Sequence, residues 1–319
     1  MQSSMKRKLR LTALLAAVSM TTLACGSDDS GGGGDGELSG ASFTVGSKEF
    51  TEQLVLGQIT VQVLEDAGAK VDDQTGITGT TNVRKALESG EIDLYWEYTG
   101  TGWAEILGNE PGEAPTDEGE LFKAVADQDL QKNNIQWTAL APVNNTYAIA
   151  TSQEASDELG VTTLSDYAEL AKDNPDDASL CAASEFIDRG DGLQGLQEAY
   201  GFELPKSSLT EVDLGIIFTR VPKQDPCNFG EVFATDGRIP ANDMVVLDDD
   251  KSFFVIYNLA LTMPKDVFDK NPALEDIFTP IAEKLTTQEL QKLNAQVDVD
   301  GLPVEQVAQK WLEDNDFIG

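Results

Sequence analysis

The stretch SFTVGSKEFTEQLVLGQITVQVLE, residues 42–65, contains the patterns of a strand, a turn and a helix in immediate succession. SFTV, residues 42–45, has the β-branched and aromatic side chains typical of a short strand, and Gly46 and Ser47 then interrupt it. Within residues 54–64 apolar side chains recur at helical spacing. A strand that leads directly into such a helix is typical of α/β proteins.

The same alternation continues along the chain. A helix capped by Thr81 and Asn82 is predicted through Leu87, and residues 92–98 then alternate as a strand does. Helices fill the rest to the carboxyl terminus from Pro272 onward. Further strands are expected near residues 147–150, 178–182, 232–235, 244–247 and 253–260. The pattern predicts an α/β fold, and because about 280 ordered residues exceed what one core usually holds, it predicts two lobes.

The amino terminus has the pattern of an export signal. Residues 1–10 carry four basic and no acidic side chains, and the 14 residues of 11–24 are mostly apolar or small. This segment is too short for a bilayer span, which needs about 20 apolar residues. TLAC, residues 22–25, resembles a bacterial lipobox, with Thr22 where leucine is usual. We therefore expect a signal peptide over residues 1–24 and a lipid on Cys25; ordinary cleavage that leaves a free cysteine is the alternative.

Residues 25–40 then form a glycine- and aspartate-rich stretch, which we interpret as a flexible linker between the lipid and the folded protein. As a flexible coil, the fifteen residues 26–40 would have a root-mean-square span of about 20 Å. The expected location is therefore extracytoplasmic, on the outer face of the cell membrane.

Charge and composition exclude several classes of protein. The net charge of −34 repels phosphate backbones and anionic lipids, so nucleic-acid binding is excluded. The chain contains no histidine, which removes Ser-His and Cys-His nucleophile pairs and histidine metal sites. No P-loop or G-x-S-x-G motif is present, and we expect no cofactor, no metal and no enzymatic activity.

Cys181 and Cys227 remain as a pair if Cys25 carries lipid. In an oxidising compartment a disulfide is the default interpretation, and two buried free thiols are the alternative. Closing a loop of about 46 residues would contribute about 4 kcal/mol in the chain-entropy model.

Six ordered motifs, spread over nearly the whole mature chain, resemble the glycine betaine/choline substrate-binding proteins of ABC importers, the ProX and OpuC-like group. They are VGSKEFTEQLVLGQI (45–59), TGTTNVRKAL (78–87), GEIDLYWEYTGTGW (90–103), NNTYAIA (144–150), EFIDRGDGLQGL (185–196) and LNAQVDVDG (293–301).

The resemblance implies a two-lobed periplasmic-binding-protein fold of type II, with ligand held between the lobes and delivered to permease subunits. In that fold the chain crosses between the lobes twice. We expect residues 41–143 and 251–319 to build one lobe and 144–250 the other, with a strand at each crossing.

A quaternary ammonium group cannot donate a hydrogen bond, so its selective binding needs aromatic faces. The positions that match the tyrosine-rich cage of the family are Tyr98, Tyr147, Phe233 and Tyr257, with Phe233 where tyrosine is usual. Each of these rings taken alone would be read as a core residue. Tyr98 ends a predicted strand, where open α/β sheets place their ligands.

The carboxylate of a betaine needs cations, and the resemblance assigns Lys48 and Arg189 to it. Lys48 precedes a helix, and Arg189 can grip a carboxylate with two hydrogen bonds. A surface ion pair of Arg189 with Asp188 or Asp191 is the alternative interpretation.

Three further residues are weaker candidates. Thr101 is a candidate hydroxyl donor to the carboxylate. Asp236 and Arg238 are candidates for supporting the site or closing the lobes, although an Asp-Gly turn would also explain them.

The predicted ligand is therefore glycine betaine, choline or a related betaine, and the same fold binding another small zwitterion or cation is the alternative. An exported hydrolase using paired carboxylates such as Asp93 and Glu97, or a lipid-anchored adhesion module, are the remote alternatives.

Overall fold

The structure is a computed structural model and describes residues 36–319. The expected signal peptide and the lipidation site at Cys25 lie outside these residues. Packed structure begins before residue 41, because Leu38 is buried and its N–H donates to the carbonyl of Ala67 at 2.9 Å. The end of the expected linker is therefore part of the fold.

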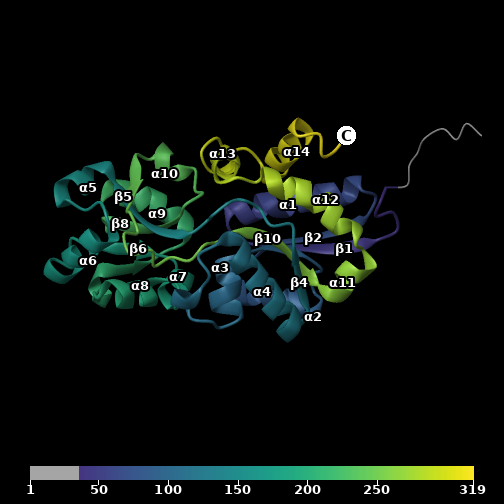
Figure 1. Ribbon diagram of the computed structural model, residues 1–319. Helices are drawn as coiled ribbons and strands as arrows, with labels where there is room; N and C mark the ends of the chain where they lie inside the picture. The colour runs from purple at the N-terminus through teal and green to yellow at the C-terminus, as the bar shows by residue number, and fades with distance from the viewer. Residues whose placement is uncertain (1–35) are drawn as a thin grey trace, which may run out of the picture. The chain divides into compact units, whose positions relative to one another are not determined.

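The first strand and helix form where the sequence predicts them. β1 (Ser42–Lys48) pairs in parallel with β2 (Lys70–Ile77), and α1 (Thr51–Asp66) connects the two strands. α1 packs against both strands and, on its other side, against α13 (Thr287–Asp298) and α14 (Val304–Asp314), as Figure 1 shows. β2 was not predicted, because its KVDDQTGI sequence is mostly polar and its residues are largely exposed.

A second sheet has the strand order β3-β10-β4 and is antiparallel. It consists of β3 (Tyr95–Tyr98), β10 (Leu259–Pro264) and β4 (Ile135–Thr138). α2 (Thr80–Ser89) and α4 (Glu118–Asn133) pack against this sheet over a core that includes Val83, Tyr95 and Trp137.

The middle of the chain forms a five-stranded sheet of order β7-β6-β8-β5-β9. Its strands are β5 (Tyr147–Ser152), β6 (Leu180–Ala182), β7 (Leu209–Glu211), β8 (Phe229–Phe233) and β9 (Met244–Val246). α9 (Leu214–Arg220) covers one face, and α6 (Leu164–Asp173) with α8 (Leu193–Tyr200) lies on the other (Figure 1). Both faces of this sheet are therefore buried.

The remaining helical segments connect these elements. They are α3 (Thr99–Thr101), η1 (Gly102–Ile106), η2 (Pro111–Glu113), α5 (Gln153–Leu159), α7 (Ser184–Asp188), η3 (Lys206–Ser208), η4 (Val221–Lys223), α10 (Arg238–Ala241), α11 (Lys265–Lys270) and α12 (Ala273–Lys284).

Two connections, residues 139–146 and 247–258, join the middle sheet to the rest of the chain, and neither contains a strand. The expectation of strands at both crossings is therefore wrong, as is the single strand predicted for 253–260. Side chains satisfy the backbone there: the N–H groups of Phe253 and Phe254 donate to the Asp249 carboxylate at 3.0 and 2.8 Å. Such local bonds replace a strand ladder.

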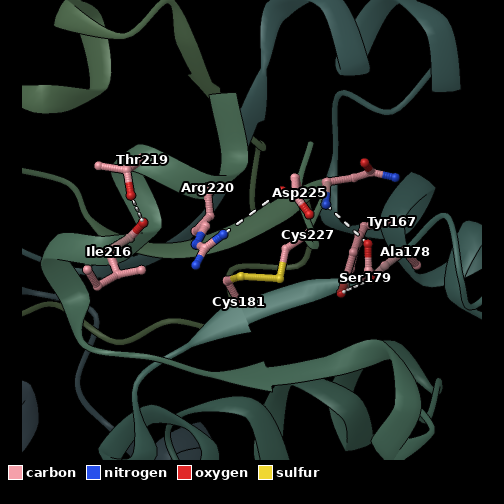
Figure 2. Close-up of a disulfide and its surroundings, with 10 residues drawn as sticks. Tyr167, Ala178, Ser179, Cys181, Ile216, Thr219, Arg220, Asp225 and Cys227 are labelled. Carbon is pink, nitrogen blue, oxygen red and sulfur yellow. Dashed lines mark hydrogen bonds and ion pairs between the residues drawn. A yellow bond between two sulfur atoms is a disulfide. The ribbon is translucent and has the colours of Figure 1, made fainter. Parts of the chain in front are cut away.

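Cys181 and Cys227 form a disulfide bond, and both residues are fully buried (Figure 2). Cys181 lies in β6 and Cys227 just precedes β8, and these neighbouring strands run parallel. The disulfide therefore joins two adjacent strands at 5.6 Å between Cα atoms.

Candidate functional site

A cavity of about 960 Å³ lies where the ends of several strands meet the starts of helices. Its lining comes from the β1–α1 turn, the start of α2, the end of β3, α7, and the end of β8. All the site residues expected from the sequence line this cavity, with the exception of Asp236. Those that line it are Lys48, Tyr98, Thr101, Tyr147, Arg189, Phe233, Tyr257 and Arg238.

The four expected aromatic residues converge on this cavity. Tyr147 and Phe233 are opposite neighbours across the β5–β8 ladder, with their ring centroids 5.2 Å apart. Tyr257, from the 247–258 connection, meets Tyr147 edge to face at 5.7 Å. Its ring rests on Gly100, where an added Cβ would lie 2.7 Å from the Tyr257 ring. Tyr98 ends β3 and is paired with Leu259 of β10.

A fifth ring, that of Phe50 at the start of α1, also lines the cavity and was not predicted from the sequence. Phe50 stacks on Phe233 at 5.0 Å and lies 6.4 Å from Tyr98, so it connects the rings of two different sheets. Its signal was present in the quoted motif, two residues after Lys48, and helical spacing alone does not show that it faces the cavity.

Burial raises the pKa values of Tyr98, Tyr147 and Tyr257 well above the ordinary value, so the three phenols are neutral. The Tyr98 hydroxyl donates to Glu52 Oε1 at 2.8 Å, and the Tyr257 hydroxyl donates to Asp191 Oδ2 at 2.6 Å. These bonds fix the orientation of both rings.

Lys48 and Arg189 line the cavity, but both are already ion-paired. Lys48 Nζ donates to Glu97 Oε1 at 2.7 Å and lies 5.2 Å from the centre of the Tyr98 ring. Arg189 donates through Nε and a second nitrogen to Asp191, and through its other terminal nitrogen to Glu185 at 2.9 Å. The alternative of an ion pair with Asp191 is thus present, although it is buried rather than on the surface.

These pairs still leave capacity for a ligand. A guanidinium has five N–H donors and an ammonium has three. Within residues 36–319, Arg189 uses three of its donors and Lys48 Nζ uses one. Thr101 is buried at the end of α3 beside them. A carboxylate would meet free donors here.

Arg238 and Asp236 form an ion pair with each other, at 2.6 Å between Arg238 Nη2 and Asp236 Oδ2. Arg238 also lies 3.4 Å from Asp298 at the end of α13 and stacks over Phe218 at 4.2 Å. An ion pair therefore connects the loop after β8 to α13, so an Asp-Gly turn alone does not account for Asp236 and Arg238.

Asp93 and Glu97, the carboxylates of the hydrolase alternative, are separately engaged. Asp93 accepts a hydrogen bond from the N–H of Thr44 at 2.7 Å, and Glu97 accepts from Lys48, from the N–H of Tyr98 and from the Tyr95 hydroxyl. Neither residue lines the cavity.

A contact spans the cavity between α2 and α7. Glu185 accepts hydrogen bonds from the Thr80 hydroxyl at 2.6 Å and the Thr80 N–H at 3.4 Å, while it also accepts from Arg189. Lys48, Thr80 and Arg189 hold the pKa of Glu185 below its usual value despite burial. The carboxylate is therefore ionised and links the five-stranded sheet to the start of α2.

A sequence profile of the family described as the substrate-binding domain of ABC-type glycine betaine transport systems matches residues 41–314. The chain belongs to this family. A protein named glycine-betaine-binding protein, from Pseudomonas aeruginosa, is 33% identical over 282 residues, which are 87% of this chain and 89% of that protein. The family resemblance stated from the motifs is thereby confirmed.

Two further relatives extend the comparison. A Helicobacter pylori protein named ergothioneine transport permease/ergothioneine binding protein EgtU is 33% identical over 272 residues, which are 85% of this chain and 47% of that protein. The structure of apo YehZ from Escherichia coli is 31% identical, with a TM-score of 0.63, and covers 86% of this chain and 99% of that chain. The two-domain periplasmic-binding-protein fold expected for the family is confirmed.

This chain is therefore a substrate-binding protein of an ABC-type transport system. Family members are binding components of transporters and work outside the cytoplasm with permeases. Within residues 36–319 no helix is both long and apolar enough to cross a membrane.

Proposed function

We propose that this chain captures a quaternary ammonium compound of the glycine betaine and choline class in the aromatic cavity and delivers it to the permease of an ABC importer. The observation that carries the proposal is the convergence of five rings on one cavity. The rings come from two different sheets, the start of α1 and the 247–258 connection, and three of them are neutral phenols. Aromatic faces attract a diffuse cation that offers no hydrogen bond. Two relatives named for glycine betaine and for ergothioneine support this ligand class.

The cationic head would contact Tyr98, Tyr147, Phe233 and Tyr257, with Phe50 as an additional wall. A carboxylate on the ligand would meet the remaining donors of Lys48 and Arg189, with Thr101 beside them. Phe233 presents an aromatic face but lacks the hydroxyl of the usual tyrosine. We therefore expect it to alter which quaternary amine the protein prefers more than the way in which the amine is bound.

We further infer that residues 41–143 with 251–319 form one lobe and residues 144–250 the other. Tyr147 and Phe233 then belong to a different lobe from Tyr98 and Tyr257. A ligand that contacts rings from both lobes prefers the closed form, and only such a preference can shift the equilibrium between forms. The permease would then recognise the closed form, while Asp236 and Arg238 tie the loop after β8 to α13.

The protein would be held at the outer face of the membrane by a lipid on Cys25, as a binding protein with no catalytic step. Mass spectrometry of the membrane fraction tests the anchor, since an unmodified Cys25 or an uncut signal would contradict it. Recovery of chemically unchanged ligand after incubation tests the absence of catalysis.

Calorimetric titration of Tyr147 variants tests the cavity itself. Tyr147→Leu removes an aromatic face and should weaken choline and glycine betaine binding by about 1 to 2 kcal/mol. Tyr147→Phe is the matched control, because among residues 36–319 no hydrogen bond to the Tyr147 hydroxyl is found, and it should bind like the wild type. Equal affinities for all three proteins would overturn the proposal.

A further inference from the structure

Glu231 is a buried carboxyl in the wall of the cavity that none of the roles above uses. It lies in β8 opposite Ile149 and two residues before Phe233, so both side chains are on the same face of the strand. Glu231 is 1% exposed and lines the cavity. Its Oε2 accepts a hydrogen bond from the N–H of Ala183 at 2.8 Å, which orients the carboxyl.

Glu231 differs from the two other buried charged groups of the cavity, Lys48 and Arg189, in having no counter-ion. Lys48, Arg189 and Arg238 each have a carboxylate partner within 4 Å. Within residues 36–319 no basic nitrogen lies within 4 Å of Glu231, and its Oε1 has no hydrogen-bond partner. An acceptor therefore remains available next to the aromatic walls.

An acceptor of this kind would distinguish between ligands of the proposed class, and the inference drawn from it rests on the proposed function. Glycine betaine carries a trimethylammonium group and a carboxylate and has no N–H or O–H, so it cannot donate a hydrogen bond to Oε1. Other quaternary amines carry a hydroxyl or a ring N–H. A site built to accept a hydrogen bond discriminates strongly against a ligand without the donor, because a buried polar group is then left unpaired.

We infer that Glu231 is a specificity-determining residue that selects quaternary ammonium compounds with an O–H or N–H donor near the cationic head over compounds without one.

The acceptor role does not depend on the charge of the carboxyl. The pKa of Glu231 is raised to about 8, mainly by burial and also by Glu185, while the Ala183 N–H and Arg189 act in the opposite direction. Both protonation states are therefore populated near neutral pH, and each retains an oxygen lone pair that can accept.

Two matched ligand pairs test the inference on the full mature protein by calorimetric titration. Carnitine and γ-butyrobetaine differ only in a hydroxyl, and in the ring-N-methyl derivative of histidine betaine a methyl group replaces the ring N–H. The donor-bearing member of at least one pair should bind about tenfold tighter or more. The pair that shows the preference identifies the donor as O–H or N–H.

Glu231→Gln should abolish the preference. The amide oxygen of the glutamine can keep the hydrogen bond from the Ala183 N–H. The NH₂ group then points toward the ligand, so that a hydrogen-bond donor of the protein faces the donor of the ligand. Glu211→Gln is the control, since Glu211 also lines the cavity but is exposed, and it should keep the wild-type ratio.

Equal affinities within both pairs, or a preference that persists in Glu231→Gln, would overturn the inference. In either case tight binding of the ligands would leave the proposed function intact. Failure of every quaternary amine to bind the wild type would instead overturn the proposed function.

Discussion

The rings of the cavity are held in two different ways. Tyr147 and Phe233 are opposite positions of the β5–β8 ladder, so backbone hydrogen bonds along both strands set their places. Tyr257 lies in a connection without a strand, where its N–H donates to Asn144 Oδ1 at 2.8 Å and its hydroxyl to Asp191 at 2.6 Å. The ladder distributes the positioning over many bonds, whereas the connection depends on two replaceable side chains.

The largest expected effect is a loss of stability in the five-stranded sheet that contains the β5–β8 ladder, called here the ladder side. Replacing Cys181 and Cys227 together with serine should lower the free energy of unfolding by about 4 kcal/mol, because a loop of 46 residues is no longer closed in the unfolded chain. Urea denaturation of the variant and of the wild type measures the loss. The β5–β8 ladder stays intact in the folded molecules, so ligand affinity at low denaturant should be unchanged.

A double-serine variant with reduced ligand affinity and unchanged stability would contradict this prediction, because it would show that the disulfide positions the rings of the cavity.

Asp191→Asn should have the next largest effect, on the connection side. It removes the charge that pairs with Arg189, a residue only 5% exposed, and weakens the bond to Tyr257. Loss of one partner of a buried pair costs about 3 kcal/mol or more. Here both stability and ligand affinity should fall, as measured by thermal unfolding and calorimetry.

Tyr257→Phe is the matched control, because it removes the same hydroxyl bond and keeps the Arg189–Asp191 pair. Its expected cost is about 1 kcal/mol. Equal losses in the two variants would show that the ion pair contributes nothing.

The last comparison is a pH dependence on the ladder side. The pKa of Glu231 is about 8 in the folded protein, mainly through burial, against a value near 4.5 in the unfolded chain. The folded state binds this proton more tightly, so its contribution lowers stability as pH rises from about 4.5 to 8 and is constant above that. The slope is at most about 1.4 kcal/mol per pH unit.

Glu231→Gln lacks this contribution, so its stability relative to the wild type should increase across that interval. Thermal unfolding of both proteins at pH 5, 7 and 9 measures the difference. A difference independent of pH would show that Glu231 has an ordinary pKa.

The same contrast explains what the sequence could predict. β1 and α1 were predicted because apolar periodicity and the Gly46-Ser47 break are local signals. The prediction of a strand over 253–260 is wrong because the side chains of Asp249, Asn144 and Thr99 accept hydrogen bonds from the backbone there. Asn144 and Thr99 are distant in sequence, and only the tertiary structure brings these side chains to the backbone, so local sequence patterns do not reveal them.

In the site, the motifs located the four rings and the two cations that the structure brings to one cavity. They did not show which acid Arg189 takes as its partner, because Asp188, Asp191 and Glu185 all lie within four residues of it. They also did not show Phe50 or Glu231, whose roles depend on which face of an element meets the cavity.

The hydroxyl bonds of Tyr98 and Tyr257 also act on the rings themselves. Each hydroxyl donates a hydrogen bond to a buried carboxyl group, that of Glu52 or Asp191, and such a bond polarises the phenol toward the electron distribution of a phenolate. The π faces of these two rings become richer in electron density than those of Phe50 and Phe233. The cavity wall is therefore electronically uneven, and a bound cation is drawn toward the two tyrosines that rest on buried acids.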